Sequence, residues 1–119
     1  MIAKAESLGS ILHCRELSDH EYDFQLRSKL LEEASEVRTA ASKSELVAEI
    51  ADVLEVIESL CLLHDIDKDS VFSMQSQKRN ERGGFCDRKF VETAEHPVGS
   101  FLEKYCLDDP EKYPEIKDL

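Results

Sequence analysis

Two groups of acidic residues stand at helical spacing in this chain. The first is Glu32, Glu33 and Glu36, and the second is Glu49 and Asp52. Residues three or four apart lie on one side of a helix, because about 3.6 residues complete a turn. If the two helices pack together, five carboxylates meet at their seam, where they require a counter-charge. A hard cation such as Mg²⁺ or Mn²⁺ suits oxygen ligands, so the pattern indicates metal-assisted chemistry on a phosphate ester.

Helical phase favours a metal site over an ordinary solvated acidic face. Four of the acids fall on the apolar side of their helices: Glu33, Glu36, Glu49 and Asp52. Glu55 and Glu58 fall on the opposite, polar side and are expected to be surface acids. No lysine or arginine on these helices has the phase to neutralise all four inward acids. We therefore predict that these four carboxylates face the interior and bind a divalent cation.

Three helices are expected to position these groups. Capping-box patterns at Ser18–Glu21 and Ser42–Glu45 begin two long helices that end near Ala40 and His64. A third, shorter helix follows and ends at Gly83, since glycine is common just past a helix end.

Outside these helices the pattern is weaker. Either Asp67 or Asp69 is expected to cap the third helix. Residues 85–95 could contain a short strand, residues 101–105 a helical turn, and the rest of the tail is expected to be irregular.

A basic segment closes the third helix and contains Lys78, Arg79 and Arg82. These cations are candidates for binding the phosphates of a triphosphate, since the guanidinium fork suits phosphate. The alternative is that they only interact with the helix C-terminal dipole.

Composition narrows the class of protein. A chain of 119 residues suits one small domain, and its net charge of -11 disfavours nucleic acid and anionic membranes as partners. The four cysteines form no CxxC pair, which favours reduced thiols. No apolar run reaches the length of a membrane span, and no signal peptide is recognisable. We therefore expect a cytoplasmic protein.

These residues together resemble the all-α nucleoside triphosphate pyrophosphohydrolases, the MazG-like group, and most closely their phosphoribosyl-ATP pyrophosphohydrolase-like branch. The family pattern Glu-Glu-x-x-Glu, a gap, then Glu-x-x-Asp is matched by Glu32–Glu36 and Glu49–Asp52. A Lys-Arg-x-x-Arg-Gly-Gly-Phe-like segment of the branch is matched by Lys78–Phe85. The resemblance runs from about Arg15 to Phe85.

The resemblance implies an all-α fold, an antiparallel helical bundle completed by oligomerisation as a homodimer or homotetramer. It implies a single domain over residues 1–119, with a helical core at about 18–84 and an irregular C-terminal extension at 85–119.

The resemblance also implies an enzyme that depends on Mg²⁺ or Mn²⁺. Such an enzyme cleaves a nucleotide between its α and β phosphates, giving a monophosphate and pyrophosphate. The substrate is expected to be phosphoribosyl-ATP-like or a non-standard nucleotide. Glu33, Glu36, Glu49 and Asp52 match the metal positions, and Glu32 or Glu36 would orient or deprotonate the attacking water. The alternative is a non-catalytic metal-binding helical interaction module. It is favoured by the lack of a Val-Arg-Asp-Lys-Ile-Pro-like segment before the first helix.

Overall fold

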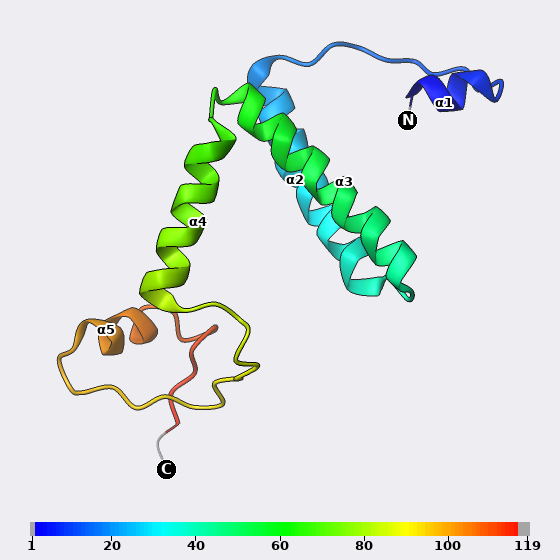
Figure 1. Ribbon diagram of the computed structural model, residues 1–119. Coiled ribbons are helices and arrows are strands. Elements are labelled where there is room, and N and C mark those ends of the chain that lie inside the picture. The colour runs from blue at the N-terminus through cyan, green and yellow to red at the C-terminus, as the bar shows by residue number, and fades with distance from the viewer. Residues whose placement is uncertain (1, 117–119) are drawn as a thin grey trace. The chain divides into compact units, whose positions relative to one another are not determined.

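The computed structural model describes residues 2–116, and its regular elements within that range are helices (Figure 1). They are α1 (Ile2–Ser7), α2 (Asp19–Thr39), α3 (Lys43–Leu63), α4 (Lys68–Arg82) and α5 (Phe101–Leu107). The predicted all-α class is confirmed. The chain divides into two compact units, Met1–Arg82 and Gly83–Leu119, so the long helices fall in the first.

Helices α2 and α3 form an antiparallel hairpin in which the two helices lie side by side (Figure 1). The predicted capping box at the start of α2 is confirmed. The Ser18 hydroxyl accepts from the Glu21 N–H, and the Glu21 carboxylate accepts from the Ser18 N–H. At the start of α3 the Ser42 hydroxyl accepts from the Glu45 N–H, whereas Glu45 reaches back to the N–H of Ala41. Only residues 40–42 separate the helices, and so short a link makes neighbouring helices antiparallel.

The core between the two helices is small. Among residues 2–116 the buried apolar side chains are Leu26 of α2 with Val56 and Cys61 of α3. At the open end of the hairpin the Asp23 carboxylate pairs with both Arg27 and His64. His64 lies just past the end of α3, so this contact joins the start of α2 to the end of α3.

One side of α3 remains without a covering layer in the single chain. Leu46, Ile50 and Leu54 follow one another at intervals of four residues, and their exposed fractions are 38%, 44% and 55%. We call these three residues the open stripe. An amphipathic helix normally buries such a stripe against another element, so the hairpin has the character of half a bundle.

Helix α4 begins after Asp67, whose carboxylate accepts from the N–H of Asp69, so Asp67 occupies the capping position. The helix ends at Arg82, followed by Gly83 in the left-handed region at φ +78°, as expected for a glycine that terminates a helix. Lys68 in its first turn pairs with Glu58 of α3 at 2.9 Å.

The prediction of a short strand within residues 85–95 is wrong. These residues form a turn near Phe85 and are otherwise irregular, and Phe90 and Val91 are exposed. A strand needs a second strand to pair its backbone groups, and the regular segments described in residues 2–116 are all helical. The helical turn expected near 101–105 is present as α5, and Ser100 caps it. Across the described residues, no helix combines the length and apolar character required to span a membrane.

Candidate metal centre

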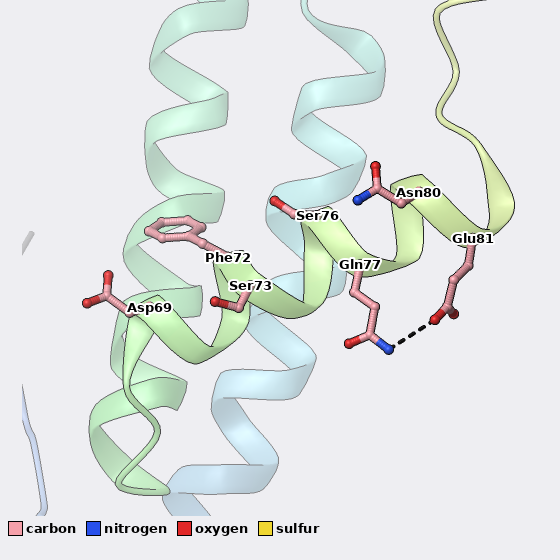
Figure 2. A pocket seen from close by; sticks show the side chains of 7 residues that line it. All are labelled: Asp69, Phe72, Ser73, Ser76, Gln77, Asn80 and Glu81. Carbon is pink, nitrogen blue, oxygen red and sulfur yellow. Dashed lines mark hydrogen bonds between the residues drawn. The ribbon is translucent and has the colours of Figure 1, made fainter.

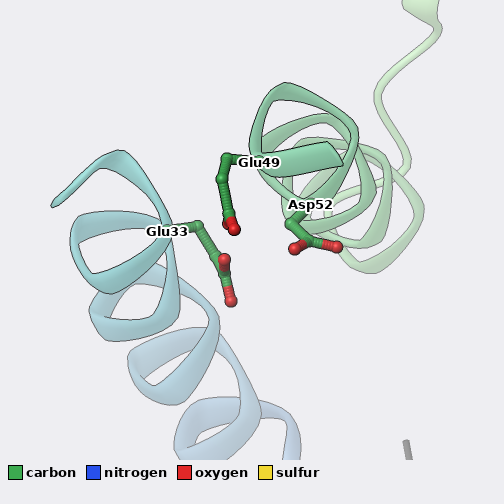
Figure 3. A group of neighbouring side chains, drawn as sticks. All are labelled: Glu33, Glu49 and Asp52. Atoms are coloured by element: carbon green, nitrogen blue, oxygen red, sulfur yellow. The ribbon is translucent and has the colours of Figure 1, made fainter. Parts of the chain in front are cut away.

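Three carboxylates converge between α2 and α3. Glu33 comes from α2, whereas Glu49 and Asp52 come from α3, and one oxygen from each lies within 4.8 Å of the others. Figure 3 shows the three side chains pointing toward one another from the two helices. Glu49 and Asp52 share a side of α3 because they are three residues apart, and the antiparallel hairpin places both opposite Glu33.

Burial differs among the three acids. Glu33 is 8% exposed and is the buried charged residue of the described part of the chain. Glu49 is half-buried and Asp52 is exposed. Burial of an ionised carboxylate is costly unless it is paired, so Glu33 identifies the place where charge must be balanced.

Burial and neighbouring negative charges both act on the carboxyl of Glu49. Burial raises the pKa of its carboxyl above the usual value, and the neighbouring charges of Asp52, Glu36 and Glu33 raise that pKa further. Part of this shift comes from like charges near the Glu49 carboxylate, and a bound cation would relieve that part.

Lys29 supplies the counter-charge of Glu33, and sequence reasoning gave this residue no role. Its Nζ lies 3.2 Å from Oε1 of Glu33 and 3.3 Å from Oε1 of Glu32. These two bonds, the one to Glu33 first, raise the pKa of the Lys29 ammonium. The sequence feature that could have predicted this pair is its spacing, because a lysine four residues before a glutamate lies on the same side of a helix.

The remaining predicted acids lie outside the group of three. Glu36 is exposed, although its charge acts on Glu49, and Glu32 is exposed and bound to Lys29. The expectation that four acids face the interior therefore fails for Glu36 and Asp52 in the single chain. Helical phase gives the direction of a side chain, but exposure depends on which elements cover that side. The metal and catalytic roles of these acids stay predictions.

The basic residues are not part of this group. Lys78, Arg79 and Arg82 are exposed on α4, and no ion pair within residues 2–116 joins them to the acids of α2 or α3. Arg79 and Arg82 stand in the last turn of α4, where cations also favour the helix dipole. Their phosphate-binding role stays a prediction.

A shallow pocket lies along α4, and none of the three basic residues lines it (Figure 2). It is lined by Asp69, Phe72, Ser73, Ser76, Gln77, Asn80 and Glu81. The Gln77 amide donates to Glu81 across a distance of 3.0 Å. The lining holds two acids and no cation, so it is unsuited to a phosphate chain.

Comparison with known proteins gives one family. The model of the phosphoribosyl-ATP pyrophosphohydrolase family matches residues 10–79, which is more than half of the 119 residues. The match contains α2, α3 and most of α4, and with them both acidic groups, Lys78 and Arg79. It ends before Arg82 and before the second compact unit. No curated protein and no solved structure matches the chain.

Proposed function

The chain belongs to the phosphoribosyl-ATP pyrophosphohydrolase family, and from that premise we propose a metal-dependent nucleotide pyrophosphohydrolase. The bond between the α and β phosphates breaks, and the products are a nucleoside monophosphate and pyrophosphate. The substrate is phosphoribosyl-ATP-like or a non-standard nucleotide. The observation that carries the proposal is the convergence of three carboxylates between α2 and α3.

The donor set fits a hard divalent cation. Glu33, Glu49 and Asp52 offer oxygen ligands only, and after burial the charges of Asp52 and Glu33 are among the causes that raise the pKa of Glu49. We propose that these three residues hold Mg²⁺ or Mn²⁺. When bound, the ion neutralises phosphate charge and lowers the pKa of a bound water. The assignment of Glu36 as a further ligand stays a prediction.

We propose Glu36, rather than Glu32, as the group that accepts the proton of the attacking water. The charge of Glu36 acts on Glu49, so Glu36 lies within electrostatic reach of the group of three. The carboxylate of Glu32 instead accepts a hydrogen bond from the Lys29 ammonium at 3.3 Å. Turnover should therefore fall further in Glu36→Gln than in Glu32→Gln when the metal is saturating.

The proposal extends to the partners of the protein. Lys78, Arg79 and Arg82 bind the distal phosphates, which their exposed cationic groups suit. The open stripe supports a homodimer or homotetramer. The net charge of -11 opposes binding to nucleic acid, and four free thiols favour a reducing, cytoplasmic setting.

Pyrophosphate release from a panel of nucleotides tests this function. The panel contains phosphoribosyl-ATP, the canonical deoxynucleoside triphosphates and damaged nucleotides, each with and without Mg²⁺. Release from at least one nucleotide only when Mg²⁺ is present is the expected result. A chain that binds the metal but turns over no nucleotide would instead be the metal-binding interaction module.

A further inference from the structure

Within residues 2–116, Lys29 is the cationic residue that forms an ion pair with an acid of the candidate metal centre. Its ammonium bridges Glu33, which is buried, and Glu32, which is exposed. The side chain of Lys29 is 41% exposed, so it is only partly covered by the rest of the chain. These facts describe a lysine held at the rim of the centre.

The bond to Glu33 conflicts with metal binding. A divalent ion held by Glu33, Glu49 and Asp52 would share the Glu33 carboxylate with an ammonium, and two cations on one carboxylate repel each other. Once the ion supplies the counter-charge, Lys29 is no longer required to neutralise Glu33. A lysine has a flexible stem and three rotatable donors, so its head group can move without moving the helix.

Glu32 gives the released ammonium a second anchor. Oε1 of Glu32 lies 3.3 Å from the Lys29 Nζ. Glu32 is not one of the three converging acids. One Lys29 donor can stay on Glu32, while the others become available beside the centre. Glu32 therefore keeps the Lys29 ammonium close to any anion that binds the metal.

We propose that Lys29 is a phosphate-binding residue whose ammonium leaves Glu33 when the metal binds and then donates to a phosphate oxygen of the nucleotide. Glu32 positions it in both states. The proposal rests on the proposed function for its ligand class, a nucleoside polyphosphate. The competing account is that Lys29 is a permanent counter-ion of buried Glu33 and never contacts substrate.

Calorimetry on the full chain separates the two accounts. The variants are Lys29→Met and Lys29→Arg, with Lys43→Met as a control because Lys43 is exposed at the start of α3. Mn²⁺ is titrated first, followed by a non-hydrolysable α,β-methylene nucleoside triphosphate at saturating Mn²⁺. In Lys29→Met, we expect Mn²⁺ affinity to hold or rise, and analogue affinity to fall about tenfold or more. Lys29→Arg should retain part of the analogue affinity, and Lys43→Met should retain both affinities.

A second measurement uses the unchanged protein, in case Lys29→Met does not fold. Labelling of lysines with an amine-reactive reagent, read by mass spectrometry, should increase at Lys29 with Mn²⁺ and decrease when the analogue is added. Weaker Mn²⁺ binding with unchanged analogue affinity in Lys29→Met, or labelling of Lys29 that ignores the analogue, would overturn the proposal. Wild-type protein that binds Mn²⁺ but no analogue would overturn the proposed function itself, which is a different result.

Discussion

The chemistry of this chain is concentrated on a few side chains whose charges do not balance. Glu33, Glu49 and Asp52 converge, and Lys29 is bound to only one of them. Burial raises the pKa of Glu49, and the like charges of Asp52, Glu36 and Glu33 raise it further, which is the repulsion that a divalent ion would remove.

Glu49→Gln should stabilise the metal-free protein at neutral pH while abolishing metal-dependent turnover. The pKa of Glu49 is raised in the folded state, so the folded chain binds that proton more tightly than the unfolded chain. Stability therefore falls as the pH rises through the unfolded value of 4.5 and the raised folded value. The gain from Gln is expected near pH 7 and should vanish below about pH 4, where Glu49 is protonated in both states.

Urea unfolding midpoints at the two pH values, measured with a chelator, check this expectation. Added Mn²⁺ should raise the midpoint of the wild-type protein but not that of the variant. Glu55→Gln is the matched control, because Glu55 is an exposed acid of α3 that is not one of the three converging acids. Glu58 is a poorer control because it pairs with Lys68. A lower midpoint for Glu49→Gln near pH 7 would show that this carboxylate stabilises the fold.

Glu33→Gln, Glu36→Gln and Asp52→Asn should also lose metal-dependent turnover while the helices survive. Sequence phase predicted correctly that Glu33 is buried. It could not predict the exposure of Asp52 or the bond from Lys29. Both depend on which side chains and elements surround a residue, and not only on its direction from the helix axis.

At the scale of helices, two serine caps and a link of three residues position the site. The sequence predicted these helices within one or two residues, because caps and apolar periodicity are local signals. The prediction of a strand within 85–95 was wrong because a strand does not depend on local signals alone. Strand formation depends on a distant partner, which the residues of that segment do not encode.

The contact of Asp23 with His64 closes the open end of the hairpin and should make its stability pH-dependent. The hydrogen bond from His64, and then Arg27, lower the pKa of the Asp23 carboxyl below the usual 3.8. A lowered folded pKa means that the stabilisation is complete above the unfolded value and is lost as the pH falls through the folded value. Asp23→Asn should therefore lower the unfolding midpoint above about pH 5, and the difference should shrink as the pH falls through the lowered folded pKa of Asp23.

Circular dichroism of urea-unfolding series at those pH values measures the Asp23 effect. Glu16→Gln serves as the control, since Glu16 is an exposed acid in the segment before α2. A midpoint of Asp23→Asn equal to wild type at every pH would mean that the contact contributes nothing to the hairpin.

Substitution of the basic residues at the end of α4 should affect nucleotide and metal binding differently from substitution of the acids. Loss of Arg79 or Arg82 is expected to weaken nucleotide binding by about 1.5–3 kcal/mol per lost charge-assisted hydrogen bond. Mn²⁺ affinity without nucleotide should not change, because a cation does not ligate a cation. If these residues only interact with the helix dipole, Arg82→Ala would cost about 0.3–1 kcal/mol of stability and leave the kinetics normal. Titration of Mn²⁺ and then nucleotide into Arg82→Ala and Lys78→Ala distinguishes the two.

At the scale of the whole molecule, the open stripe of Leu46, Ile50 and Leu54 predicts self-association. Few side chains are buried between α2 and α3, and a second copy would supply the missing layer. Light scattering should give at least a dimer for the wild-type protein, and Ile50→Glu should dissociate it by placing a charge in the interface. Leu62→Glu is the control, because Leu62 lies near the end of α3, outside the open stripe, and is 84% exposed. A stable wild-type monomer at micromolar concentration would contradict the prediction.

The central claim is that this chain uses a divalent ion between α2 and α3 to break the bond between the α and β phosphates. Phosphorus NMR of the products tests it most directly, with chelator-treated protein and the nucleotide that the panel identifies. The account predicts signals of a monophosphate and pyrophosphate that appear only when Mg²⁺ or Mn²⁺ is added, and that do not appear with Glu49→Gln. Orthophosphate and a diphosphate as products, or turnover that persists without metal, would contradict it.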